Sequence, residues 1–317
     1  MTTKPLAVVA VGGNALILDD AHTALNDQYD AVCETATHVA TMIAAGWNVV
    51  LTHGNGPQVG FILRRSEIAD GQVPTVPVQY AVGDTQGAIG FMFQNALGNA
   101  LQRRGLRIPV VTLVTQTLID RNDPAFQKPT KPIGSFMTEE VARTLAAKLG
   151  WTVMQDGDRG WRRAIASPQP QRVIEAPIIE RLAREGTLII ACGGGGIAVE
   201  EVAGGELRGV EAVIDKDRAS ALLAIEMRAD LLMIPTGVPR VAIRFGKPDQ
   251  QWLDRLTVAE AEKYAAEGHF GAGSMGPKIE ALLTFAKGRP GGRGVITDPP
   301  NIDRALRGET GTWIEAE

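Results

Sequence analysis

The chain has 317 residues, of which 44% are hydrophobic, and carries a formal net charge of −4. This length fits one large α/β unit or two lobes that share a core, and the apolar fraction is that of an ordinary globular protein rather than a disordered one. The acidic balance argues against a nucleic-acid-binding or membrane-surface protein, so we expect no nucleic-acid partner and no membrane partner.

Other protein classes are disfavoured by local features of the sequence. No apolar run approaches the roughly 18–20 residues needed to cross a bilayer. The first residues lead directly into an apolar stretch, so we expect no signal peptide and a cytoplasmic protein. The two cysteines, Cys33 and Cys192, have a spacing that predicts neither a disulfide framework nor a zinc site.

Strand-like apolar runs alternate with helical patterns along most of the chain. Strands are predicted over residues 6–11, 48–52, 108–114, 187–192, 231–234, 240–245 and 293–296. Helical spacing of apolar residues predicts helices over residues 27–45, 79–104, 173–185, 218–228, 258–267 and 277–287. This alternation predicts an α/β fold, a three-layer αβα sandwich around a mostly parallel open sheet. Ligands of such sheets bind beyond the carboxyl ends of the strands.

Residues 119–172 interrupt the alternation. This segment is rich in Pro, Lys, Arg and Asp, and residues 151–155 and 161–166 within it read as a hairpin. A long insertion in a compact domain is usually functional and often a lid; the alternative is a surface excursion without a role.

Glycines follow three of the predicted strands. They form the clusters Gly12, Gly13 and Asn14; Gly54 and Asn55; and Gly193, Gly194, Gly195 and Gly196. Free backbone N–H groups at a strand end, followed by a helix N-terminus, form an anion site, so several clusters at one sheet edge predict bound phosphates. A tight strand-to-helix turn is the alternative for any single cluster. Four consecutive glycines are costly to order, which indicates close approach to something bulky, such as the tail of a nucleotide.

The common nucleotide-binding motifs are absent or misplaced. A G-x-G-x-x-G pattern at residues 271–276 does not follow an apolar strand, so it is a false positive for a dinucleotide site. The P-loop and the protein-kinase signatures do not occur. If the chain handles ATP, it does so outside those classes.

Three lysines are notable for their positions. Lys131 lies in the insertion, whereas Lys216 and Lys278 lie at predicted helix starts, where a cation is unfavourable unless an anion is nearby. Asp217 could hold Lys216 and Lys278 in position. The alternatives are that the lysines are ordinary solvated surface charges and that Asp217 is an ordinary helix N-cap. His53 adjoins a glycine cluster, where packing or capping is favoured over substrate contact. No catalytic triad and no metal-ligand spacing is present.

Six segments together resemble carbamate kinase, a member of the amino acid kinase fold family. They are residues 8–15, 52–60, 122–134, 193–196, 209–217 and 273–278, within a resemblance that runs from about residue 6 to residue 314. The resemblance implies a transferase that reversibly moves a phosphoryl group between ATP and carbamate, giving ADP and carbamoyl phosphate, with Mg²⁺ as cofactor. It further implies that the reaction runs towards ATP synthesis in nitrogen catabolism, as part of arginine metabolism.

The resemblance also implies which part of the chain binds which substrate. Residues 1–205 would form the acceptor-binding lobe, with residues 119–172 as its protruding lid, and residues 206–317 the nucleotide-binding lobe. A homodimer would pair through the N-terminal lobe. By position, the carbamate and γ-phosphate site would comprise Gly12, Gly13, Asn14, Gly54 and Asn55. Lys131, Lys216 and Lys278 would surround the transferring phosphoryl group, with Asp217 as their organiser. The nucleotide site would comprise Gly193 to Gly196, Thr236, Val238, Gly273, Ser274 and Met275.

The residue chemistry fits that reaction. Carbamate is already an anionic oxygen nucleophile, so no general base is needed and the lack of a catalytic histidine is expected. Two alternatives stay open. The acceptor could be another small carboxylate, selected by the region of Gln79 and Tyr80, which departs from the family pattern. The chain could also be a catalytically silent regulator that binds nucleotide or carbamoyl phosphate.

Overall fold

The computed structural model describes residues 4–13, 16, 22, 24–271 and 273–316. Its main sheet has eight strands in the order β15-β17-β16-β12-β1-β2-β9-β3. These strands are β1 (Leu6–Val11), β2 (Asn48–His53), β3 (Val110–Thr112), β9 (Leu188–Ala191), β12 (Leu231–Pro235), β15 (Arg255–Thr257), β16 (Arg293–Thr297) and β17 (Thr312–Glu315). All pairs are parallel except β16 with β17, which confirms the mostly parallel open sheet.

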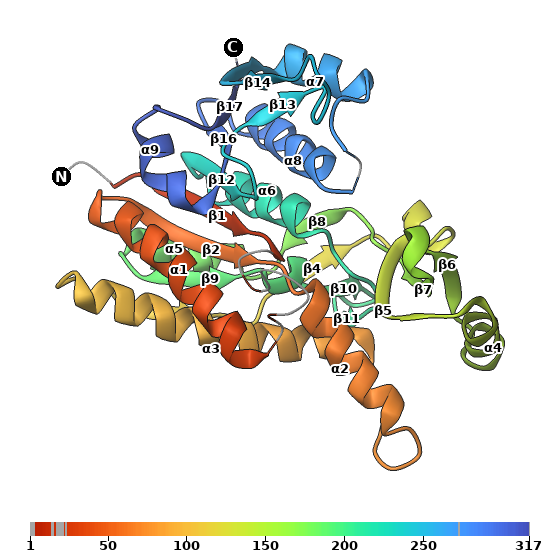
Figure 1. The fold of residues 1–317 in the computed structure, drawn as a ribbon. Helices are drawn as coiled ribbons and strands as arrows, with labels where there is room; N and C mark the ends of the chain where they lie inside the picture. The colour runs from red at the N-terminus through yellow and green to blue at the C-terminus, as the bar shows by residue number, and fades with distance from the viewer. Residues whose placement is uncertain (1–3, 14–15, 17–21, 23, 272, 317) are drawn as a thin grey trace.

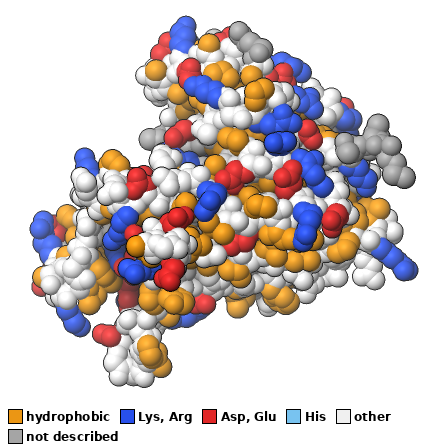
Figure 2. Space-filling view, turned by 180° about the vertical axis from the view of Figure 1, so that it is seen from behind, with side chains coloured by type: hydrophobic (Ala, Val, Ile, Leu, Met, Phe, Trp, Pro, Cys, Tyr) orange, Lys and Arg blue, Asp and Glu red, His pale blue; other side chains and the backbone are white. Residues whose placement is uncertain are grey.

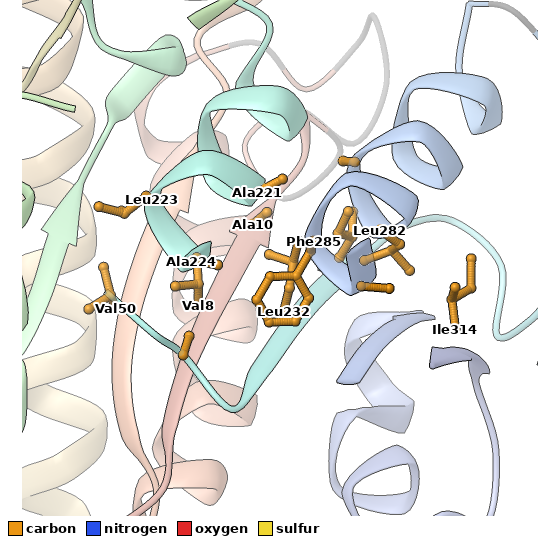
Figure 3. Packing of buried hydrophobic residues seen from close by; sticks show 14 of the residues in the cluster. Val8, Ala10, Val50, Ala221, Leu223, Ala224, Leu232, Leu282, Phe285 and Ile314 are labelled. Carbon is orange, nitrogen blue, oxygen red and sulfur yellow. The ribbon is translucent and has the colours of Figure 1, made fainter. Parts of the chain in front are cut away.

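Helices cover both faces of this sheet (Figure 1). One face carries α1 (Leu25–Ala44), α3 (Val78–Arg103) and α9 (Ile302–Leu306), and the other carries α5 (Ala176–Arg184), α6 (Lys216–Glu226) and α8 (Met275–Gly288). Because successive side chains of a strand point to opposite faces, β1 serves both cores. Val8 and Ala10 pack with α6 and α8 (Figure 3), whereas Val9 and Val11 pack with α1 and α3. The predicted αβα sandwich is confirmed.

Strand β1 joins the two halves of the molecule. It pairs with β2 on one side and with β12 on the other, so the sheet continues from the first predicted lobe into the second. The carboxyl ends of β1, β2 and β12 therefore meet at one edge, where the glycine clusters follow.

The insertion folds as a separate small layer. Strands β5 (Lys131–Met137), β6 (Thr152–Gln155) and β7 (Trp161–Ile165) form an antiparallel sheet, accompanied by α4 (Glu139–Leu149), and they project from the body (Figure 1). Thr138 caps the start of α4, and Gly150 ends it with a φ of 69°. We call residues 131–165 the protruding subdomain. The predicted hairpin is confirmed, and its link contains the short turn η3 (Gly157–Arg159).

A second sheet connects the protruding subdomain to the body. It consists of β4 (Gln116–Ile119), β8 (Pro170–Val173), β10 (Ile197–Glu201) and β11 (Leu207–Gly209). These strands are not predicted from the sequence, because they are short and at most partly buried. The helix predicted at residues 173–185 begins three residues too early, because Val173 ends β8 and α5 begins at Ala176.

The strand predicted at residues 240–245 exists but lies outside the main sheet. It is β13 (Val241–Ile243), and it pairs antiparallel with β14 (Gln251–Leu253). The remaining elements are α2 (Gly56–Ile68), α7 (Val258–Ala266) and the short turns η2 (Pro124–Phe126), η4 (Gly193–Gly195) and η5 (Pro299–Asn301).

Surface properties agree with the composition. Within the described residues, no helix is both long and apolar enough to cross a membrane. On the face turned away in Figure 1, acidic and basic side chains are interspersed (Figure 2).

Candidate active site

A cavity of about 990 Å³ opens at the edge where β1, β2 and β12 end. Further parts of its wall come from the starts of α6 and α8, the protruding subdomain, α1 and the turn η5. The predicted site residues that line it are Gly12, Gly13, Gly54, Asn55, Lys131, Gly194, Lys216, Asp217, Thr236, Gly273, Ser274 and Lys278. Asn14 lies outside the described residues. The tertiary structure thus brings most of the predicted residues to one place.

Asp217 joins two lysines from different helices. Lys216, the first residue of α6, contacts Asp217 Oδ1 and donates to the Ala10 carbonyl at 3.3 Å. Lys278, in the first turn of α8, donates to Asp217 Oδ2 at 3.1 Å. Asp217 therefore holds both lysines, as predicted. The alternative that Asp217 is an ordinary N-cap is wrong, because Asp215 caps α6.

Asp215 brings the third lysine to the same place. Its side chain accepts from the backbone N–H groups of Asp217 at 2.9 Å and Arg218 at 3.3 Å, and it forms an ion pair with Lys131 at 3.2 Å. The sequence analysis did not assign Asp215. An aspartate directly before a helical pattern is an N-cap signal that could have identified it.

The electrostatics of this cluster favour an anion. Burial lowers the pKa of Lys216; Asp217 opposes that shift, whereas the neighbouring charge of Lys278 adds to it. Burial alone would raise the pKa of Asp215, but the ion pair with Lys131 and the backbone hydrogen bonds hold that pKa below its ordinary value. Three lysines facing two carboxylates leave one positive charge, which an anionic group would neutralise.

The strand-end glycines lie against the lysine cluster. A Cβ added to Gly54 would lie 3.7 Å from both the Gly13 nitrogen and Lys216 Cδ, so the ends of β1 and β2 meet beside the lysine stem. Buried Asn55 donates from Nδ2 to Thr85 Oγ1 at 2.9 Å. The small acceptor predicted here would therefore contact backbone and an oriented amide.

The four glycines at residues 193–196 are required by the protein's own packing. An added Cβ would lie 2.6 Å from the His53 ring at Gly193, 2.2 Å from Asn55 Nδ2 at Gly194, 2.6 Å from the Ile214 carbonyl oxygen at Gly195, and 2.1 Å from Thr117 Oγ1 at Gly196. These protein contacts, rather than a bulky ligand, explain the absence of side chains. Of the four, Gly194 lines the cavity, and it does so beside Asn55.

A further part of the cavity wall is formed by the C-terminal half of the chain. Thr236 and Gly237 follow β12, and Gly273 and Ser274 precede α8, whereas Val238 and Met275 are not among the described residues that line the cavity. The segment at residues 271–276 follows α7 rather than a strand, which confirms that its glycine pattern is no dinucleotide fingerprint.

His53 is a packing residue. Its side chain is buried, Nδ1 is 2.9 Å from the Gly54 carbonyl oxygen, and the ring stacks on Phe93 with centroids 5.9 Å apart. Burial is the main cause that lowers the pKa of His53, to about 4. The imidazole is therefore neutral at physiological pH, and the packing interpretation is confirmed.

The residues at the cavity do not build a metal cage. Among the described residues, no group of three or more His, Cys, Asp or Glu side chains is placed to hold a metal ion. Asp215 and Asp217 are both engaged by lysines. A Mg²⁺ ion here would depend chiefly on oxygens supplied by a ligand, as is usual for Mg²⁺ with nucleotides.

Two arginines of the protruding subdomain, Arg159 and Arg162, also line the cavity. The segment that contains them is predicted from the sequence only as a hairpin, so neither arginine is predicted as a site residue. No local motif marks them, because their approach to the cavity depends on how the subdomain folds back.

The chain belongs to one family of known sequences and structures. A model of the amino acid kinase family matches residues 5–298. The carbamate kinase-like protein YahI of Escherichia coli is 49% identical over 98% of this chain and 99% of that protein, and the carbamate kinase of Thermococcus kodakarensis is 47% identical over the same shares. The structure of Giardia lamblia carbamate kinase bound to AMP-PNP superimposes with a TM-score of 0.94 at 38% identity, covering 100% of both chains.

Proposed function

Because the chain belongs to the amino acid kinase family, among the carbamate kinases and carbamate kinase-like proteins, we propose that it is a carbamate kinase. It transfers a phosphoryl group reversibly between ATP and carbamate, and we infer that it runs towards ATP from carbamoyl phosphate in nitrogen catabolism. The observation that supports this best is the convergence of Lys131, Lys216 and Lys278 on the segment Asp215–Asp217, at the edge where the strand-end glycines lie.

The proposed mechanism needs positioning and charge neutralisation rather than a base. Carbamate attacks the γ-phosphorus with its own anionic oxygen, the bond from that phosphorus to the bridging oxygen breaks, and ADP leaves. Lys216 and Lys278, held by Asp217, offset the charge on the equatorial oxygens. The neutral His53 takes no part, since no proton must be removed from the nucleophile.

We assign the acceptor to the N-terminal end of the cavity and the nucleotide to the other end. Gly12, Gly13, Gly54 and Asn55 would hold carbamate, together with Gly194, which packs on Asn55. The nucleotide would lie along Thr236, Gly273 and Ser274. These ends correspond to the proposed lobes of residues 1–205 and 206–317. Mg²⁺ would accompany the nucleotide and add positive charge at its phosphate oxygens.

The hypothesis that the region of Gln79 and Tyr80 selects another small carboxylate as acceptor lacks structural support. Gln79 and Tyr80 are not among the described residues that line the cavity, and Tyr80 is 66% exposed on the outer side of α3. A role of this region in choosing a different carboxylate is therefore not favoured. The lysine cluster is complete, which also speaks against a catalytically silent regulator.

We further propose a homodimer formed through the outer face of α3. Tyr80 and Phe91 are 66% and 65% exposed, and eleven residues apart they lie on the same side of the helix. Apolar side chains exposed in this way favour an interface. Sedimentation velocity of the wild type and of Phe91→Lys should show a dimer and a monomer, respectively.

Both cysteines are free thiols, which fits the proposed cytoplasmic location.

The reaction is tested by ATP formation from ADP, Mg²⁺ and carbamoyl phosphate, with acetyl phosphate as the control donor. We expect activity with carbamoyl phosphate and little with acetyl phosphate. Comparable activity with both donors would indicate a broader acyl-phosphate enzyme. Nucleotide binding without activity on either donor would favour the regulator.

A further inference from the structure

The protruding subdomain contributes to the cavity wall a guanidinium group that has no anionic partner among the described residues. Arg159, on η3, and Arg162, on β7, both line the cavity. Both also lie over the ring of Phe136, with their guanidinium carbons 4.5 and 4.9 Å from its centroid. The aromatic ring thus holds two positive charges close together at the edge of the site.

Arg162 is held by polar contacts within the protein, whereas Arg159 is not. Arg162 donates from Nε to the Gly134 carbonyl at 3.1 Å and from Nη1 to Asp156 at 2.9 Å. Arg159 makes no hydrogen bond and no ion pair with any residue that the structure describes. A guanidinium stacked on a ring keeps its edge donors free for a bidentate anion.

The charges along the wall single out the same residue. Five basic side chains line the cavity in the described part of the chain: Lys131, Arg159, Arg162, Lys216 and Lys278. Four of them contact a carboxylate, namely Asp215, Asp156 or Asp217. Arg159 is the remaining one, and it lies on the same subdomain as Lys131.

We infer that Arg159 contacts the substrate directly and binds the phosphoryl oxygens of the acyl phosphate, with Phe136 as its positioning residue. This inference deepens the proposed function and rests on it. Arg159 neutralises charge that the Asp217 cluster does not reach.

The test compares Arg159→Gln with Arg159→Lys and with Arg143→Gln. Arg143 is the matched control, because it is also on the protruding subdomain and lies 5.4 Å from the Trp161 ring centroid, yet it pairs with Glu139 and does not line the cavity. Steady-state kinetics gives kcat and the KM values for carbamoyl phosphate and for ADP, and calorimetry without ADP gives the Kd of carbamoyl phosphate.

We expect Arg159→Gln to lower kcat/KM for carbamoyl phosphate by about tenfold or more and to weaken its binding, with the KM for ADP nearly unchanged. Arg159→Lys should recover part of the loss, and Arg143→Gln should behave as the wild type. Unchanged carbamoyl phosphate kinetics and Kd in Arg159→Gln, or an equal loss in Arg143→Gln, would overturn the inference while leaving the proposed function intact. A wild type that binds carbamoyl phosphate through Arg159 without making ATP would instead overturn the proposed function.

Discussion

Lys278 Nζ lies 3.1 Å from Asp217 Oδ2, although the two residues are 61 positions apart in the chain. The contact ties the first turn of α8 to the first turn of α6, two helices that pack on the same face of the sheet. Helix N-termini carry partial positive charge, so each lysine there adds to a field that already favours an anion. Asp217 offsets part of that charge and orients both ammonium groups.

Asp217→Asn should lower kcat by a factor on the order of 10² to 10³, the usual cost of losing a preorganised electrostatic group. The amide has the size of the carboxylate but neither its charge nor its capacity to accept from two ammonium groups. Steady-state kinetics measures the loss, and calorimetric unfolding serves as the control for folding. A variant with wild-type turnover would show that the two lysines need no common anchor.

Lys131→Ala and Lys216→Ala should each reduce turnover by at least about 10²-fold while the fold survives. Lys131 is half-exposed, and its partner Asp215 keeps its role as the cap of α6 after the substitution. In Lys216→Ala, Asp217 retains Lys278 as a partner. Far-ultraviolet circular dichroism should be unchanged in both, and near-normal kcat in either would contradict the proposed phosphoryl site.

The pH dependence of kcat/KM should reveal the lowered pKa of the buried Lys216. Because burial lowers the pKa of Lys216, kcat/KM should decline on the alkaline side at a pH below the range of an ordinary lysine, about 10.4. Asp217 opposes the shift, so Asp217→Asn should move the decline to lower pH. The pH profile of kcat/KM measures both effects, and an alkaline limb that stays in place in the variant would argue against this assignment.

His53 should make the fold sensitive to acid. Its pKa falls from 6.5 to about 4 on folding, so between these values the unfolded state binds a proton that the native state excludes. Stability is then complete above pH 6.5 and falls by on the order of 3 kcal/mol as the pH drops to 4. Chemical denaturation at several pH values should show a shallower dependence for His53→Gln than for the wild type.

Gly194→Ala should impair acceptor binding, because the new Cβ would lie 2.2 Å from Asn55 Nδ2 at a φ of 65°. Gly150→Ala is the matched control, since Gly150 has a φ of 69° and nothing within 4 Å of the added Cβ. Both variants should lose about 1 kcal/mol of stability from the backbone conformation. A raised KM for carbamoyl phosphate is expected in Gly194→Ala alone; equal KM values would exclude the crowding of Asn55 as a determinant of binding.

Several features of the site follow from sequence alone because they depend on near neighbours. Apolar runs and helical spacing predicted six of the eight strands of the main sheet and five of the six helices that cover it, whereas β15, β17 and α9 were not predicted. Glycines at the ends of β1 and β2, and lysines at the starts of α6 and α8, are likewise local, because strand ends and helix starts are set within a few residues. Parallel strand order then implies that these ends meet at one sheet edge.

Only the tertiary structure decided which of these residues touch. The Asp217–Lys278 contact, the ion pair between Lys131 and Asp215, and the crowding of Gly194 by Asn55 join segments far apart in the chain. The same holds for Arg159, whose place at the cavity depends on the fold of the protruding subdomain. Strand order, crossovers and side-chain packing across layers set such distances, and a linear pattern of residues carries none of them.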